Sequence, residues 1–130
     1  MILIDSSVWI EFLRVNGNAE AQARVADHLI SGEARIAEPI LLELWNGVKG
    51  REERKQIAKI EQSVPILPCT SEVFKLSYRV ADLSRAAGLT VPSIDLIIFS
   101  IAAFHNVKID TLDKHLRLLE KKIKLQVDMS

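Results

Sequence analysis

The 130-residue chain predicts a single α/β domain, over residues 1–130, built around a parallel sheet. Short apolar segments typical of strands alternate with longer segments of helical periodicity, which favours parallel strands joined by helices. The first segment, residues 2–4, is apolar throughout, as expected of a strand buried on both faces. No linker, repeat or low-complexity segment interrupts this order, so one domain is expected.

The first half of the chain is expected to be mainly helical. Residues 8–13 and 19–30 carry apolar side chains at helical spacing, and a short strand is expected at 35–37. Pro39 indicates the first turn of the next helix, where proline is tolerated, and the apolar residues after it predict a mostly buried helix. Residues 51–62 are highly charged and predict a surface helix.

The second half alternates strands and helices. Residues 64–68 predict an edge strand because prolines bracket it. Strands are also expected at 107–109 and at 123–127, where apolar residues alternate. Helices are expected at 71–88, at 94–105, which is the most apolar of the chain, and after a turn at 110–113.

Composition narrows the possible functions without choosing one. Lys+Arg and Asp+Glu number 17 each, so nucleic-acid binding would have to come from a local basic patch. The single cysteine, Cys69, offers no disulfide or zinc cluster and fits a reducing cytosol. No leader pattern is present, and no apolar run approaches the roughly 20 residues that span a bilayer. We therefore expect a cytoplasmic protein without a membrane partner.

Four acidic residues occupy positions that indicate a functional site. One closes the first strand, one lies within the apolar helix, and two open later helices: they are Asp5, Glu43, Asp95 and Asp113. Ligands of open α/β sheets bind at the carboxyl ends of the strands. Burial of a lone carboxylate is costly, whereas a hard divalent cation would satisfy several together. Oxygen ligands without a Cys/His cluster favour Mg²⁺ or Mn²⁺ over zinc.

Each acid also has a structural alternative. Asp5 could cap the helix that follows it, and Asp95 and Asp113 could be ordinary acids in the first turn of a helix. Glu43 could pair with a distant arginine. The residues by themselves leave open whether the four side chains converge.

Four motifs resemble those of PIN domains, and especially the VapC-type toxins of type II toxin–antitoxin pairs. They are Ile-Asp-Ser-Ser-Val-Trp-Ile at 4–10, Glu-Pro-Ile-Leu-Leu-Glu-Leu-Trp-Asn-Gly at 38–47, Val-Pro-Ser-Ile-Asp-Leu-Ile-Ile at 91–98, and Ile-Asp-Thr-Leu-Asp-Lys-His-Leu at 109–116. They fall in the family's order and cover essentially the whole chain. The resemblance implies a three-layer α/β/α sandwich around a central parallel sheet of four to five strands.

The resemblance also implies a function and a set of partners. It implies a metal-dependent endoribonuclease that cleaves cellular RNA phosphodiesters as the toxin of a toxin–antitoxin pair. The expected metal is Mg²⁺ or Mn²⁺, and the expected partners are an RNA substrate, a cognate antitoxin and a second copy in a homodimer. The implied ligands are Asp5, Glu43, Asp95 and Asp113, with hydroxyl groups beside them on Ser6 and Thr111.

Two positions depart from the family's pattern. Asp110 stands where an apolar residue is more frequent, so the site could hold an extra charge or the strand could end early. Leu116 replaces a frequent aromatic residue, which we interpret as a change in core packing only. Ser6 could also act as a plain helix cap.

Lys114 is the candidate for a contact with RNA, because it follows the last acid directly, and Arg117 lies one turn further on. A second group of cations follows the glutamate helix, but glutamates interleave with it, which favours a solvated helix face: Lys49, Arg51, Arg54, Lys55 and Lys59. Trp9 and Trp45 are expected in the core or at a dimer contact. His115 is expected to be an exposed helical histidine.

Three rival functions remain. A phospho-acceptor signalling module would need paired acids after the first strand, where Ser6 and Ser7 stand instead. An inactive PIN-like binding module would be expected to lack one or more of the four acids. A non-toxin PIN nuclease of RNA processing would share the chemistry.

Overall fold

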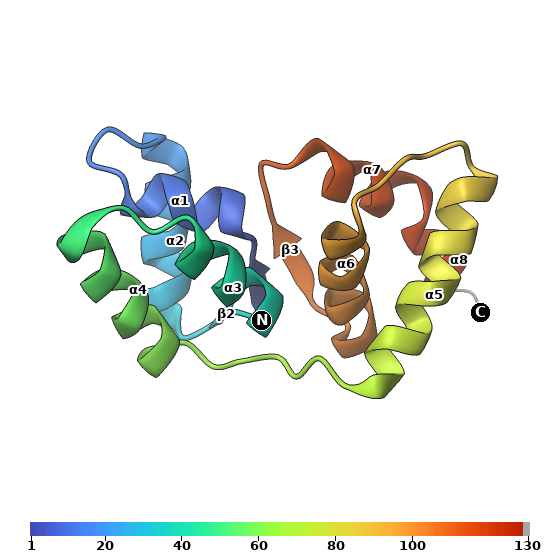
Figure 1. Cartoon of the computed structure of the whole chain (residues 1–130), viewed down its shortest axis with the longest axis horizontal. Helices are drawn as coiled ribbons and strands as arrows, with labels where there is room; N and C mark the ends of the chain where they lie inside the picture. The colour runs from blue at the N-terminus through green and yellow to red at the C-terminus, as the bar shows by residue number, and fades with distance from the viewer. Residues whose placement is uncertain (129–130) are drawn as a thin grey trace.

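A three-stranded parallel sheet lies at the centre of the computed structural model, which describes residues 1–128 (Figure 1). The strands are β1 (Ile2–Ile4), β2 (Ala34–Arg35) and β3 (Lys108–Asp110), in the order β2-β1-β3. Leu3 is paired with Arg35 on one side and with Ile109 on the other. The α/β class and the parallel sheet are confirmed, but the expected four to five strands are not: the described residues form three.

Two expected strands are replaced for identifiable reasons. At residues 64–68 the prolines remove backbone donors, so only an isolated parallel bridge joins Ile66 to Ile36. Residues 124–127 are helical instead of extended, and Ile123 is the C-cap residue of the helix before them. Leu116, Leu119 and Ile123 are fully buried at helical spacing, so Ile123 continues the apolar stripe of a helix.

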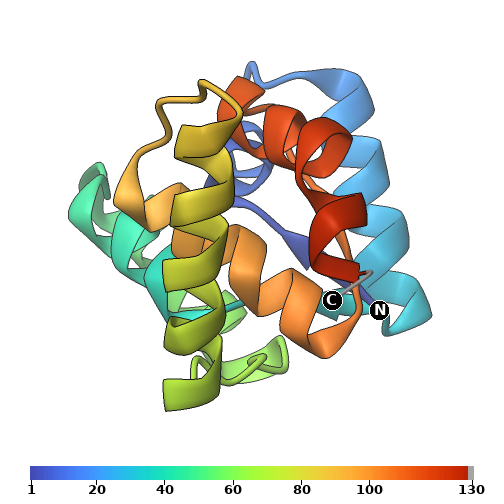
Figure 2. The same ribbon diagram turned by 90° about the vertical axis from the view of Figure 1, so that its right-hand side faces the viewer.

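Eight helices complete the described chain. They are α1 (Ser6–Leu13), α2 (Ala19–Ser31), α3 (Glu38–Asn46), α4 (Gly50–Ser63), α5 (Ser71–Ala86), α6 (Ser93–His105), α7 (Lys114–Lys122) and α8 (Lys124–Asp128). Figure 1 shows α1 to α4 to one side of the strands and α5 to α8 to the other. Figure 2 shows α5 beside α6, with α7 and α8 next to them and α2 beyond. None of these helices is both long and apolar enough to cross a membrane.

The core forms around β1, the middle strand. Leu3 and Ile4 are fully buried, as predicted for a strand covered on both faces. Val8 and Trp9 of α1 and four residues of α6, among them Ile98 and Ile101, join the same core. The charged helix α4 buries only two side chains, which agrees with its predicted surface position.

The ends of several elements meet at one edge of the sheet. The backbone N–H of Asp5, just after β1, donates to the carbonyl of Asp110 at the end of β3, 3.0 Å away. Asp5 and Asp113 occupy the N-cap positions of α1 and α7, and Asp95 lies in the first turn of α6. Helix α6 packs against both α3, which carries Glu43, and α7. The parallel topology therefore gathers residues that are far apart in the sequence.

Candidate metal centre

Asp5 is held by hydroxyl groups rather than by a helix N-terminus. It occupies the N-cap position of α1, but its side chain makes no capping hydrogen bond. One carboxylate oxygen, Oδ2, accepts hydrogen bonds from Ser7 Oγ (2.7 Å) and Thr111 Oγ1 (2.9 Å). Only 3% of the residue is exposed. The side chain of Asp5 therefore does not cap the helix, which was the structural alternative for this residue.

Ser7 and Thr111 connect Asp5 to the loop that follows β3. Ser7 Oγ accepts the backbone N–H of Leu112 (3.0 Å), and Thr111 Oγ1 accepts that of Asp113 (2.9 Å). Each hydroxyl has one proton, and each donates it to Asp5. The carboxylate is therefore fixed by a network that also orders residues 111–113. Thr111 was expected near the last acid and does accept the N–H of Asp113, but it also donates to Asp5. The serine that contacts Asp5 is Ser7 rather than the expected Ser6.

Ser6 contacts a different acid. Its Oγ donates to Glu43 Oε1 at 3.0 Å, so it links α1 to α3. Glu43 is half-buried, and burial is the main cause that raises the pKa of its carboxyl group. The charges of Asp5, Asp95 and Asp113 raise this pKa further, and the hydrogen bond from Ser6 opposes them. The partner of Glu43 is thus a serine, not the distant arginine considered as an alternative.

Asp95 lies in the first turn of α6 and is 8% exposed. Burial raises the pKa of its carboxyl group to about 6. The negative charges of Asp113 and Asp5 add to the increase, and His115 opposes it. A cation that neutralises the neighbouring charges would lower the free-energy cost of ionising the Asp95 carboxyl group.

Asp113 caps α7 with one of its oxygens. Asp113 Oδ1 accepts the backbone N–H groups of His115 (2.8 Å) and Leu116 (3.1 Å). Asp113 is thus the N-cap residue of α7, one position before the first turn that the structural alternative gave it. The carboxylate nevertheless faces Asp95, whose pKa it raises, so capping and a role in the site are compatible.

His115 was expected to be exposed and is instead half-buried between two of the acids. Its Nδ1 lies 3.7 Å from Asp95 Oδ2 and 3.6 Å from Asp113 Oδ1. Ligand atoms of these three residues all lie within 4.8 Å of one another. Sequence reasoning missed this residue, although its place two positions after Asp113 was the available signal.

The chemistry of this cluster suits a divalent cation. Its carboxylate oxygens are the donors that Mg²⁺ or Mn²⁺ prefers, and the imidazole nitrogen of His115 lies beside them. No ion pair within residues 1–128 joins a lysine or arginine to Asp5, Glu43, Asp95 or Asp113. The raised pKa values of Glu43 and Asp95 therefore reflect burial and repulsion that such a cation would relieve.

Other predicted residues lie outside this cluster. The carboxylate of Asp110 accepts two hydrogen bonds from Arg24, at 3.1 and 3.2 Å, and so faces α2 instead of the four acids. Lys114 is exposed at the first residue of α7, next to Asp113. Trp9 is fully buried in the core, whereas Trp45 is half-buried and donates to Glu61 at 2.9 Å.

Comparisons with known proteins agree with this fold and arrangement. The sequence model of the PIN domain matches residues 2–122. The chain is 31% identical over 130 residues to VapC ribonuclease Mb1587 of Mycobacterium bovis, with 97% of this chain and 96% of that protein covered. The same values hold for Ribonuclease VapC11 of Mycobacterium tuberculosis. A solved structure of FitAB bound to an IR36 DNA fragment superposes with a TM-score of 0.77 and 23% identity, covering 92% of this chain and 91% of that chain, which is a likeness of fold.

Proposed function

Because the chain belongs to the PIN domain family, we propose that it is a metal-dependent endoribonuclease that acts as the toxin of a toxin–antitoxin pair. One observation carries this proposal: acids from four separate segments lie close enough for their charges to raise the pKa values of Glu43 and Asp95, and within residues 1–128 no lysine or arginine forms an ion pair with any of the four. The two relatives at 31% identity are both named ribonucleases, which supports RNA as the substrate.

We assign the binding of one or two Mg²⁺ or Mn²⁺ ions to the four acids. Asp5 and Asp95 are the direct ligands, and Asp113 binds directly or through water. A bound cation supplies a Lewis acid that stabilises negative charge on the phosphodiester during hydrolysis. Ser7 and Thr111 hold the Asp5 carboxylate in one orientation before any ion arrives, so little reorganisation accompanies binding.

Glu43 completes the site or orients the attacking water. Ser6 holds its Oε1, so we assign the other oxygen, Oε2, to the water. The raised pKa of Glu43 brings its carboxyl group closer to neutral pH, where a side chain accepts and returns a proton most effectively. This role requires the hydrogen bond from Ser6, because a rotating carboxylate would not present one oxygen consistently.

The partners follow from the family and from the position of single residues. Lys114 is exposed beside Asp113 and is assigned a contact with an RNA phosphate. A cognate antitoxin is proposed to cover the acids and a second copy to form a homodimer. These assignments rest on the resemblance to VapC-type toxins.

The test is cleavage of total cellular RNA by purified protein freed from any partner. Reactions contain Mg²⁺, Mn²⁺ or EDTA, and compare wild type with Asp5→Asn and with the matched control Asp27→Asn on the exposed face of α2. We expect discrete fragments that require metal. Asp5→Asn should lower the rate by more than the roughly 10- to 100-fold typical of a lost positioning partner, and Asp27→Asn should cleave normally.

Two results would contradict the proposal. Folded wild-type protein that cleaves under neither metal would favour the binding-module alternative. Cleavage that persists in EDTA and in Asp5→Asn would show that the four acids are not responsible for it.

A further inference from the structure

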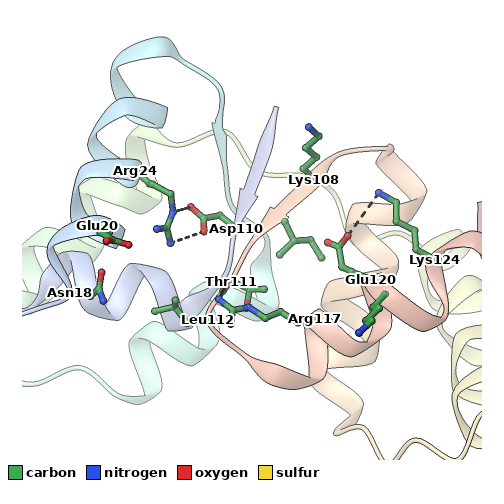
Figure 3. Close-up of a pocket in the computed structure, with 12 residues that line it drawn as sticks. Asn18, Glu20, Arg24, Lys108, Asp110, Thr111, Leu112, Arg117, Glu120 and Lys124 are labelled. Atoms are coloured by element: carbon green, nitrogen blue, oxygen red, sulfur yellow. Dashed lines mark hydrogen bonds and ion pairs between the residues drawn. The ribbon is translucent and has the colours of Figure 1, made fainter.

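A groove of about 710 Å³ follows the outer edge of β3 (Figure 3). Arg24 and Glu20 of α2 form one wall, and α7 with the first residue of α8 forms the other. In Figure 3, Thr111, Leu112 and Arg117 lie together at one end of the groove and Lys108 lies at the other. The groove is thus elongated along the strand and separate from the four acids.

The groove is nevertheless joined to the acids through shared residues. Thr111 lines it and donates its hydroxyl proton to Asp5 at 2.9 Å. Leu112 also lines it, and its backbone N–H donates to Ser7 at 3.0 Å. An extended ligand that is bound at the acids and continues along β3 would therefore enter this groove directly.

The groove carries more positive than negative charge. Five cationic and three acidic side chains line it, and two of these acids are already paired. Asp110 is bound by Arg24, and Glu120 lies 4.0 Å from Lys124. No carboxylate in the described part of the chain lies within ion-pair distance of Lys108 or Lys121, both of which are exposed.

Backbone and side-chain donors point into the same space. The carbonyl of Asp110 faces β1, because it accepts the N–H of Asp5. The neighbouring residue in a strand points its peptide groups the opposite way, so both the N–H and the carbonyl of Ile109 face the outer edge. Arg117 is held at the end near the acids, where its guanidinium donates to the Thr111 carbonyl at 3.1 Å. The N–H of Ile109 and the guanidinium of Arg117 are donors for anionic oxygens.

We propose that this groove binds the phosphodiester backbone of single-stranded RNA on one side of the cleaved bond, with Lys108 and Lys121 as phosphate contacts. The inference rests on the proposed function, because continuity with the acids selects RNA among anionic ligands. The volume would also admit a free nucleotide, since small-molecule sites span roughly 300–1,000 Å³. Both share phosphate chemistry, and the experiment distinguishes them.

The experiment measures RNA binding without cleavage. A fluorescent pool of random single-stranded RNA is titrated with protein in EDTA over a series of salt concentrations. The double variant Lys108→Gln/Lys121→Gln is compared with wild type and with the matched control Lys55→Gln/Lys59→Gln on the exposed face of α4. Loss of two phosphate contacts should reduce the slope of log affinity against log salt by about 1.4, since each contributes about 0.7 for single strands.

Cleavage with metal gives a second readout. The groove variant should raise KM and leave kcat near the wild-type value, because Lys108 and Lys121 lie away from the acids. The control variant should match wild type in salt slope and KM. A mononucleotide should compete weakly with the RNA pool.

Three results would overturn the inference: an unchanged slope and KM for the groove variant, an equal loss in the control variant, or a mononucleotide that competes as well as RNA. Failure of the proposed function would give a different result in these two assays. Wild type would then bind RNA through Lys108 and Lys121 in EDTA but would not cleave with either metal.

Discussion

At the scale of the residue, the site depends on how a buried charge is held. Asp5 is 3% exposed, and Ser7 and Thr111 both donate to one of its oxygens. Hydrogen bonds to the charged form offset part of the cost of burial. The hydroxyls also leave the second oxygen, Oδ1, available to a ligand, so the same contacts stabilise the fold and prepare the site.

Thr111→Val tests this double role. The change removes a donor to Asp5 and an acceptor for the Asp113 N–H, so we expect a loss of about 1–3 kcal/mol in the free energy of unfolding. RNA cleavage should fall roughly 10- to 100-fold. Urea unfolding and initial cleavage rates measure the two effects, with Thr90→Val in the exposed turn before α6 as control. Wild-type stability and cleavage in Thr111→Val would contradict the assignment.

The pKa of Asp95 predicts how stability changes with pH when no metal is bound. It is raised from 3.8 to about 6, so the folded state retains a proton that the unfolded state has lost. This contribution is fully present below pH 4 and is lost as pH rises through 6, which lowers the free energy of unfolding by up to about 3 kcal/mol. Urea unfolding in EDTA at pH 4.5 and 6.5 should show this fall in wild type and a smaller one in Asp95→Asn.

Asp27→Asn, on the exposed face of α2, is the control and should retain the pH dependence of wild type. If Asp95→Asn has the same pH dependence as wild type, the environment ascribed to Asp95 is wrong.

Residue identity could be predicted better than residue contacts. The sequence pattern singled out the four acids, because each follows a strand or begins or interrupts an apolar helix, and the resemblance to PIN domains added Thr111. It chose Ser6 beside Asp5, whereas the direction of α1 brings Ser7 to Asp5 and sends Ser6 to Glu43. The place of His115 two positions after Asp113 brings it near that acid, but its approach to Asp95 depends on how α7 packs against α6.

At the scale of the element, the N-terminus of α7 combines capping with the site. Asp113 Oδ1 accepts two backbone N–H groups of the first turn. Such a cap stabilises a helix by typically about 1 kcal/mol, and asparagine caps as well as aspartate. The two functions of Asp113 can therefore be separated by substitution.

Asp113→Asn should keep the free energy of unfolding within about 0.5 kcal/mol of wild type, whereas Asp113→Ala should lose about 1 kcal/mol. Both variants should cleave RNA poorly, because both lack the charge assigned to metal binding. Urea unfolding with parallel cleavage assays separates the effects. Equal stability of the two variants would refute the capping role, and full cleavage by Asp113→Asn would refute the metal role.

The C-terminal segment shows where element prediction reaches its limit. Alternating apolar residues at 123, 125 and 127 predicted a strand, but the segment is helical. Ile123 is fully buried in line with Leu119, whereas Leu125 is 69% exposed. Over five residues, period-2 and helical patterns share positions, and burial against the core decided between them.

At the scale of the whole molecule, topology brings distant segments together. Parallel strands end at one edge of the sheet, so Asp5 after β1 and residues 111–113 after β3 become neighbours. Glu43 and Asp95 reach them because α3 and α6 pack against each other. The order of motifs was readable from the sequence, but the convergence of the acids required the fold.

The distribution of charge over the surface also depends on the fold. The net charge is zero, so the chain has no global field that would attract RNA. The groove along β3 concentrates cations locally beside an acidic centre. Composition predicted that nucleic-acid binding would need a local basic patch, and the cations of this groove form such a local concentration.

The central claim is that acids from four segments form one metal centre. Anomalous diffraction from crystals grown with Mn²⁺ tests it most directly. We predict a peak within about 2.1–2.4 Å of carboxylate oxygens of Asp5 and Asp95, close to Asp113 and Glu43, and no such peak in Asp5→Asn crystals. A manganese ion bound elsewhere, or ordered acids without one at saturating Mn²⁺, would contradict the claim.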